Sequence, residues 1–131
     1  MRVLIVQSNE ALCRVWSRHL ERLGVTVTSA HSGSDAVERV ENQTFDCIVL
    51  DLVLGEGSAL TVADLAYFRQ PEASVVFVTD TTFFSDGSIF SHSANARAFV
   101  EKTTPPNDLA AIVQHYGEES TSRDHAPEYT Q

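Results

Sequence analysis

Residues 45–58 read Phe45-Asp46-Cys47-Ile48-Val49-Leu50-Asp51-Leu52-Val53-Leu54-Gly55-Glu56-Gly57-Ser58 and are the most informative segment of the sequence. A short apolar run ends at a lone carboxylate, Asp51, and a loop with two glycines follows. Such a run predicts a buried β-strand. In open α/β sheets, functional side chains lie just outside the carboxyl ends of the strands. The segment therefore places Asp51 at the edge of a sheet, where other strand ends can bring it partners.

The rest of the chain alternates strand and helix patterns. Further strands are predicted at Arg2–Val6, Val25–Ala30, Ser74–Thr79 and Ala96–Glu101, and helices at Glu10–Leu23, Asp35–Asn42, Ser58–Arg69, near Asp86 and from Pro105 onward. This alternation implies right-handed crossovers and a parallel sheet covered on both faces. We expect a flavodoxin-like, doubly wound (βα)5 fold in three α/β/α layers with strand order 2-1-3-4-5. Val25–Ala30 alternates apolar and hydroxyl residues, which predicts an edge strand.

The chain has 131 residues, enough for one domain with a hydrophobic core. We assign residues 1–116 to this domain. From Gly117 onward no apolar period is present, so residues 117–131 are predicted to form a disordered acidic tail.

Composition excludes several classes of function. The formal net charge of −9 argues against binding to nucleic acid, because neutralising phosphates requires clustered Lys and Arg. No stretch approaches the ~20 apolar residues of a membrane helix, and the apolar N-terminal run is too short for a signal peptide. Cys13 and Cys47 are far apart in the sequence and are predicted to be free thiols. We therefore expect a cytoplasmic protein.

In the expected strand order, four strands end near one another. Their terminal residues are Gln7-Ser8, Asp51, Thr79 and Lys102. Lys102 is the only lysine among nine basic residues. A compact ammonium in a chain that otherwise uses arginine indicates a site that needs a point charge.

These strand ends resemble the receiver domain of bacterial response regulators, and the resemblance covers residues 1 to about 116. The segment from Asp51 to Leu60 has the length and pattern of the family's Asp-Leu-x-Leu-Pro-Asp-Gly-Ser-Gly-Leu version. The resemblance implies that Asp51 is the phosphoacceptor and that Lys102 binds the phosphoryl oxygens. It also implies that Thr79 is the hydroxyl donor and that Phe99 is the aromatic switch residue. A lysine and a hydroxyl donor would offset the charge that builds up when a carboxylate attacks a phosphoryl group.

The sequence departs from the family at the metal site. Gln7 and Ser8 stand where the family has an acidic pair, which holds Mg²⁺ together with the phosphoacceptor. The metal-site positions in this chain are Gln7, Ser8, Asp51 and Val53, and Asp51 is the only carboxylate among them that could bind Mg²⁺. A carboxylate and an ammonium are nearly charge-balanced without a metal, so Asp51 and Lys102 could pair directly.

We expect a standalone receiver domain in two-component phosphorelay signalling, a signalling protein rather than an enzyme. The expected partners are a sensor histidine kinase or phosphotransfer protein, and a downstream protein or second copy that binds through the face of the fourth helix, fifth strand and fifth helix. The alternative, favoured by Gln7-Ser8, is a phosphorylation-independent pseudo-receiver that acts as an adaptor or dimerisation module. An aspartyl-phosphate hydrolase would need a second acid at position 53, where this chain has Val53, so this class of enzyme is discarded.

Overall fold

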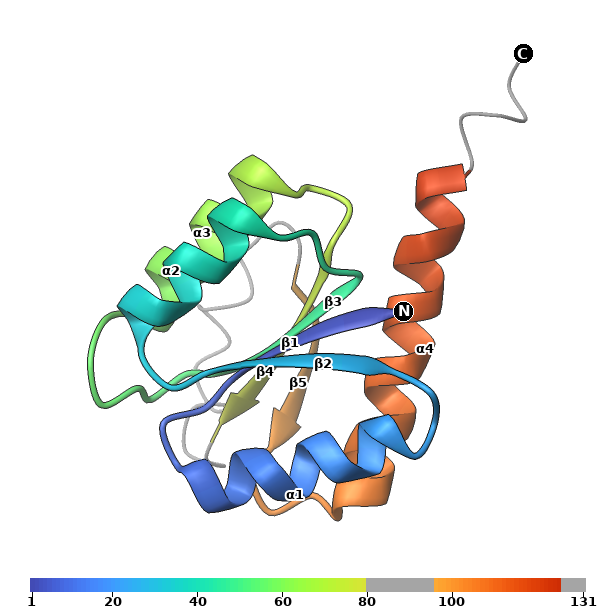
Figure 1. Cartoon of the computed structure of the whole chain (residues 1–131), viewed down its shortest axis with the longest axis horizontal. Coiled ribbons are helices and arrows are strands. Elements are labelled where there is room, and N and C mark those ends of the chain that lie inside the picture. The colour runs from blue at the N-terminus through green and yellow to red at the C-terminus, as the bar shows by residue number, and fades with distance from the viewer. Residues whose placement is uncertain (80–95, 126–131) are drawn as a thin grey trace.

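The computed structural model describes residues 1–79 and 96–125, with the side chains described as far as residue 120. Five parallel strands form one sheet in the order β2-β1-β3-β4-β5 (Figure 1). The strands are β1 (Arg2–Val6), β2 (Thr26–Ala30), β3 (Cys47–Asp51), β4 (Ser74–Thr79) and β5 (Ala96–Glu101). The described helices are α1 (Glu10–Glu21), α2 (Gly33–Asn42), α3 (Ala59–Arg69) and α4 (Pro106–His125). The helix predicted near Asp86 lies outside the described residues.

The sheet has the predicted order, and β2 is an edge strand as its alternation indicated. β1 lies between β2 and β3, with Val3 opposite both Val27 and Cys47. In the next pair of strands, Asp51 stands opposite Val78. The central strands β1, β3 and β4 are almost entirely buried, as expected for a parallel sheet covered on both faces.

The strand side chains alternate between two hydrophobic cores. On one face, residues such as Leu4, Ile48 and Phe77 pack beneath α2 and α3. On the other face, residues such as Ile5 and Val49 pack against α1 and α4. Figure 1 shows these two helix pairs on opposite sides of the sheet. The resulting arrangement is the predicted three-layer α/β/α architecture.

The first three helices begin at polar caps that the sequence supplies. Asn9, Ser32 and Ser58 each accept a hydrogen bond from the backbone three residues later, at 3.1, 3.1 and 3.4 Å. Because Ser32 is the cap, α2 begins at Gly33, two residues before the predicted start. At its other end, α1 gives way to Gly24, whose left-handed φ of 85° turns the chain toward β2.

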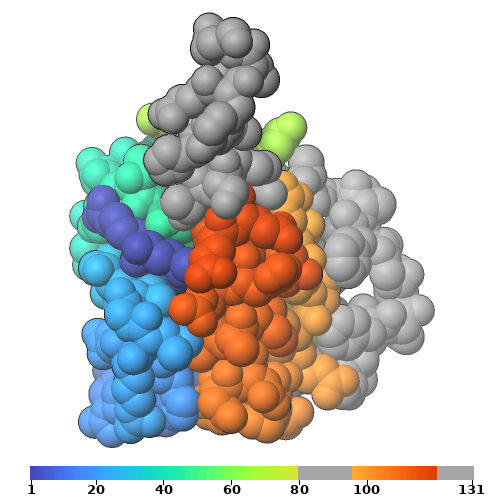
Figure 2. Space-filling view, turned by 90° about the vertical axis from the view of Figure 1, so that its right-hand side faces the viewer, coloured from blue at the N-terminus to red at the C-terminus, as the bar shows by residue number. Residues whose placement is uncertain are grey.

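The prediction that disorder begins at Gly117 is wrong for residues 117–125, because α4 continues to His125. Small residues rather than apolar ones make this part of the helix fit. Gly117 is buried so close to Met1 that a Cβ there would lie 2.5 Å from the methionine sulfur. One turn later, buried Ser120 donates a hydrogen bond to the carbonyl of Glu72. Figure 2 shows the start of the chain, in dark blue, against the red-orange part of α4.

Candidate functional site

Asp51 ends β3 and is completely buried. Its Oδ2 atom lies 3.0 Å from the Lys102 Nζ and accepts a hydrogen bond of 2.7 Å from the Gln7 Nε2. Its Oδ1 accepts a hydrogen bond of 2.9 Å from the backbone N–H of Val53. A buried carboxylate is stable only with such partners, since burial removes its hydration. Both oxygens of Asp51 are therefore engaged by this chain's own donors.

Lys102 and Thr79 reach the site from neighbouring strand ends. The backbone N–H of Lys102 donates to the Thr79 carbonyl at 2.9 Å, which fixes the start of the lysine side chain beside the end of β4. Thr79 is fully buried, whereas the lysine side chain is 33% exposed. Lys102 thus lies at the rim, between Asp51 and solvent. The structure brings together the lysine and the aspartate that the sequence predicted, with Thr79 adjacent.

Phe99 lies on β5, three residues before Lys102. Its ring stacks on Phe77 of β4, with 5.0 Å between the ring centroids and 25° between the planes. The two residues are also paired in the sheet register. Phe99 is only partly buried and packs against the core beneath α2 and α3. Phe99 on the edge strand β5 is therefore in direct contact with the buried core through Phe77.

Gln7 is the site residue whose contact the sequence did not predict. The sequence indicated the loss of a metal ligand at this position. In the structure, the buried amide of Gln7 is instead a direct partner of Asp51. The signal was present: β1 and β3 are adjacent parallel strands, so residues that follow them meet at one edge, and a glutamine can donate to a carboxylate. The neighbouring Ser8 is exposed.

The β3–α3 loop, residues 52–58, is fixed to the start of α2. The Glu56 carboxylate accepts hydrogen bonds from the backbone N–H of Ser34 at 3.1 Å and from its hydroxyl at 2.9 Å. The Glu56 carbonyl accepts a bond of 2.7 Å from the N–H of Gly33. These contacts with Ser34, chiefly the bond from its hydroxyl, hold the pKa of Glu56 below its ordinary value. Because this loop carries Val53, its attachment to α2 helps to place a donor at Asp51.

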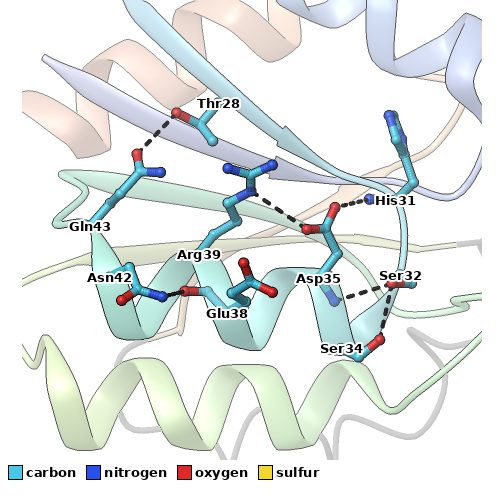
Figure 3. Close-up of polar contacts among 9 residues, drawn as sticks. All are labelled: Thr28, His31, Ser32, Ser34, Asp35, Glu38, Arg39, Asn42 and Gln43. Carbon is cyan, nitrogen blue, oxygen red and sulfur yellow. Dashed lines mark hydrogen bonds and ion pairs between the residues drawn. The ribbon is translucent and has the colours of Figure 1, made fainter.

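His31 connects the site to the face of α2 that lies toward β2. Its Nδ1 is 3.0 Å from the Gln7 carbonyl, and because a carbonyl only accepts, Nδ1 carries the proton in this contact. The His31 backbone N–H lies 3.4 Å from the Asp35 carboxylate, which also pairs with Arg39 at 3.5 Å (Figure 3). Ser32 caps the same helix turn. The segment that leads from β2 into α2 is therefore tied both to Gln7 and to the helix.

The residues at this site do not fit a magnesium ion. Mg²⁺ requires oxygen ligands in near-octahedral geometry, but Gln7 turns its amide nitrogen, a donor, toward Asp51. Within the described ranges 1–79 and 96–125, no group of three or more His, Cys, Asp or Glu side chains could hold a metal. Glu10, the acid that lies nearest to Gln7 and Ser8 in the sequence, is exposed at the start of α1.

This arrangement first defines a class: a doubly wound α/β domain that presents a buried aspartate, a lysine and a threonine at the carboxyl edge of its sheet. Comparison with known proteins supplies the family. The response regulator receiver domain matches residues 3–114. The chain therefore belongs to the response regulator receiver domain family and is a receiver domain of two-component signal transduction. Domains of this family interact with histidine kinases or phosphotransfer proteins and with downstream targets, and they generally bind Mg²⁺ at the phosphorylation site.

Individual relatives agree with this assignment. The alginate biosynthesis transcriptional regulatory protein AlgB of Pseudomonas putida is 32% identical over 108 residues, which are 82% of this chain and 24% of AlgB. The response regulator receiver protein CpdR of Brucella abortus is 27% identical over 78 residues, 60% of this chain and 65% of CpdR. A CheY-like receiver domain protein from Methanospirillum hungatei shares the fold, with a TM-score of 0.83, 24% identity and coverage of 93% and 97% of the two chains. The chain thus spans about a quarter of the AlgB relative's length.

Among the described helices, none is both long and apolar enough to cross a membrane.

Proposed function

We propose that this receiver domain accepts a phosphoryl group on Asp51 from a sensor histidine kinase or a phosphotransfer protein. The observation that carries the proposal is the 3.0 Å contact between the Lys102 ammonium and the Asp51 carboxylate at the carboxyl edge of the sheet. A cation in direct contact with a buried nucleophile can also bind the group that the nucleophile receives. Thr79, at the end of the adjacent strand, would supply a hydroxyl donor.

The proposed step is an in-line transfer. A carboxylate oxygen of Asp51 forms a bond to phosphorus, and the bond from phosphorus to the donor's nitrogen or oxygen breaks, with the electron pair leaving on the donor. The product is an acyl phosphate, which carries more negative charge than the carboxylate did, and Lys102 offsets that charge. Because Asp51 is completely buried and Lys102 is 33% exposed, the lysine side chain must swing outward to admit the donor.

The proposed output runs through β5. A shift of Thr79 toward a phosphoryl group would disturb the end of β4, which is paired with β5 in register. Phe99, stacked on Phe77 and partly exposed, would then change its packing at the β5 edge. The face formed by β5 and α4 would bind a downstream protein or a second copy. Residues 80–95, where the fourth helix was predicted, lie outside the described residues.

Incubation with acetyl phosphate followed by intact-mass measurement tests the proposal. We expect the wild-type protein to gain one phosphoryl group, which hydroxylamine removes because an acyl phosphate is labile to it. Asp51→Asn keeps the size of the side chain and should abolish the adduct. Asp46→Asn is the matched control, because Asp46 lies just before β3, at the other end of the strand, where it accepts a bond from the Arg2 N–H.

The proposal is wrong if no adduct forms with acetyl phosphate, phosphoramidate or a phosphorylated histidine phosphotransfer domain. It is also wrong if the adduct survives in Asp51→Asn. The first result would leave only an output that works without phosphoryl chemistry, and the second would place the phosphoryl group on a residue other than Asp51.

A second candidate function, a phosphorylation-independent adaptor or dimerisation module, is favoured by one observation. Three donors already engage Asp51, from Gln7, Lys102 and Val53, so the carboxylate is satisfied in the resting state. For such a module, Asp51→Asn should leave partner binding or dimerisation unchanged. In a phosphorylation-dependent domain the same substitution should abolish the response of that binding to acetyl phosphate.

A further inference from the structure

Gln7 is held by hydrogen bonds at every polar group it possesses. Its backbone N–H donates to the Ala30 carbonyl at 3.0 Å, and its carbonyl accepts from the Nδ1 of His31 at 3.0 Å. Its side-chain Oε1 accepts from the backbone N–H of Asn9 at 3.0 Å, and its Nε2 donates to Asp51 at 2.7 Å. The residue is 1% exposed. A side chain built in this way has one position and one orientation.

The orientation of the amide follows from its partners. The Asn9 N–H can only donate, so it requires the amide oxygen, and the ionised Asp51 carboxylate can only accept, so it requires the amide nitrogen. Rotation of the Gln7 amide by 180° would place donor against donor and acceptor against acceptor. The NH₂ group of Gln7 therefore points at Asp51. A divalent cation bound beside Asp51 would need an oxygen ligand from this position instead.

We infer that the Gln7 amide, together with Lys102, takes the place of the divalent cation at this site, so that Asp51 is held and balanced without a metal. The charges support this assignment. Asp51 and the Lys102 ammonium, 3.0 Å apart, sum to zero. A divalent cation bound here would add two positive charges beside the ammonium and would have a single carboxylate as its ligand. The inference concerns only the unphosphorylated site. It therefore holds whether or not Asp51 can accept a phosphoryl group.

The inference predicts which single change restores a cation site. Gln7→Glu keeps the length of the side chain but replaces the NH₂ donor with a carboxylate oxygen, which is then forced against Asp51. A divalent cation is the simplest means of relieving that repulsion. Gln43→Glu is the matched control, because Gln43 accepts a hydrogen bond through its Oε1 from Arg2 at the other end of the sheet. Both variants lower the net charge by the same amount.

Thermal unfolding in millimolar MgCl₂, compared with NaCl of the same ionic strength, separates the cases. We expect no Mg²⁺-specific change in the midpoint for the wild-type protein or for Gln43→Glu, and a rise of several degrees for Gln7→Glu, since a ligand that binds only the folded state stabilises it. In parallel, ¹⁵N NMR of the wild-type protein follows the Gln7 side-chain NH₂ and the Val53 N–H during a Mg²⁺ titration. We expect neither signal to move, and this measurement does not depend on any variant folding.

Two results would overturn the inference. One is a saturable Mg²⁺ effect on the wild-type midpoint or on those two NMR signals, which would show that the metal binds despite Gln7. The other is a folded Gln7→Glu variant that responds to Mg²⁺ no more than Gln43→Glu does, which would remove Gln7 as the determinant. Neither readout involves phosphorylation, so failure here is distinguishable from failure of the acetyl phosphate experiment.

Discussion

Replacing Gly57 with alanine should be among the most destabilising small substitutions in the loop beside Asp51. Gly57 has a left-handed φ of 88°, which costs about 1–2 kcal/mol for an alanine. A Cβ would also lie 2.7 Å from the Cα of Gly33. Relief of that contact requires the loop to move off α2 and to stretch the bond from the Gly33 N–H to the Glu56 carbonyl, a form of overpacking that costs about 1–3 kcal/mol. The expected loss for Gly57→Ala is therefore about 2–5 kcal/mol in the free energy of unfolding.

Two other glycines separate the two causes. Gly24→Ala has the same kind of backbone, with φ 85°, but no atom within 4 Å of the new Cβ, so it should show only the backbone cost of about 1–2 kcal/mol. Gly33→Ala has no left-handed backbone but brings a Cβ to 2.8 Å from the Gly57 Cα, so it should show only the contact. Urea unfolding followed by circular dichroism, with the slope m checked for constancy, gives the three values.

The two facing glycines should also be energetically coupled. Once one alanine has pushed the loop away from α2, a second at the facing position should cost less, so the Gly33→Ala/Gly57→Ala double variant should lose less than the sum of its parts. If Gly57→Ala proves no more destabilising than Gly24→Ala, the close approach of the loop to α2 carries no energy and the expected contact cost is wrong.

Three further predictions concern single residues. Contacts with Ser34 hold the pKa of Glu56 below its ordinary value of 4.5. The ionised Glu56 carboxylate should therefore stabilise the fold fully above pH 4.5, and this contribution should be lost as the pH falls through the lowered pKa. The ¹³C NMR signal of the Glu56 carboxyl should titrate below pH 4.5, and Glu56→Gln should weaken the loss of stability in acid. Burial raises the pKa of the Cys47 thiol to about 12, so this thiol should react with Ellman's reagent at pH 8 only after unfolding. Ser120→Ala should lower the free energy of unfolding by about 1 kcal/mol, because it removes the hydrogen bond that the buried Ser120 hydroxyl donates to the Glu72 carbonyl; no change in urea unfolding would mean that this part of α4 contributes little.

The fold was predictable because local patterns and topology agree. The apolar runs within Arg2–Val6, Cys47–Asp51 and Ser74–Thr79 became the buried strands β1, β3 and β4. The hydroxyl alternation in β2 became the edge position. The pairing of Asp51 with Lys102 was predictable from two facts together: both residues stand at the carboxyl edge of the sheet, and a carboxylate and an ammonium balance each other's charge. The length of α4 was not predictable in this way. Gly117 and Ser120 look like residues that end a helix, yet their small size is what lets the helix pack on Met1 and Glu72.

The contacts that the sequence did not reveal are those between the β3–α3 loop and the start of α2, which are made by common residue types without a recognisable motif. Gly33 and Gly57 are 24 residues apart, and only the three-dimensional structure shows that each is small because of the other. Glu56 accepts hydrogen bonds from the N–H and the hydroxyl of Ser34, a residue 22 positions earlier in the chain. Such pairings depend on the separation of two loops, which hydrophobic periodicity does not encode.

In the arrangement proposed above, Gln7 and Ser8 stand where the resemblance places the family's acidic pair, and the loss of the acids and the loss of the cation form one coordinated change. In the family's arrangement, three carboxylates are balanced by a divalent cation and one lysine. Removal of two carboxylates alone would leave an excess of two positive charges around the remaining aspartate, so the metal must be lost with them. What then remains, Asp51 and Lys102, is again neutral, and the vacated side of the carboxylate receives the Gln7 amide at 2.7 Å. Gln7, held by its backbone and by Asn9, donates an oriented hydrogen bond to Asp51 and adds no charge. A buried carboxylate whose charge an ammonium already balances needs such a neutral donor. The arrangement proposed above thus retains the geometry of Asp51 and removes its dependence on a cation.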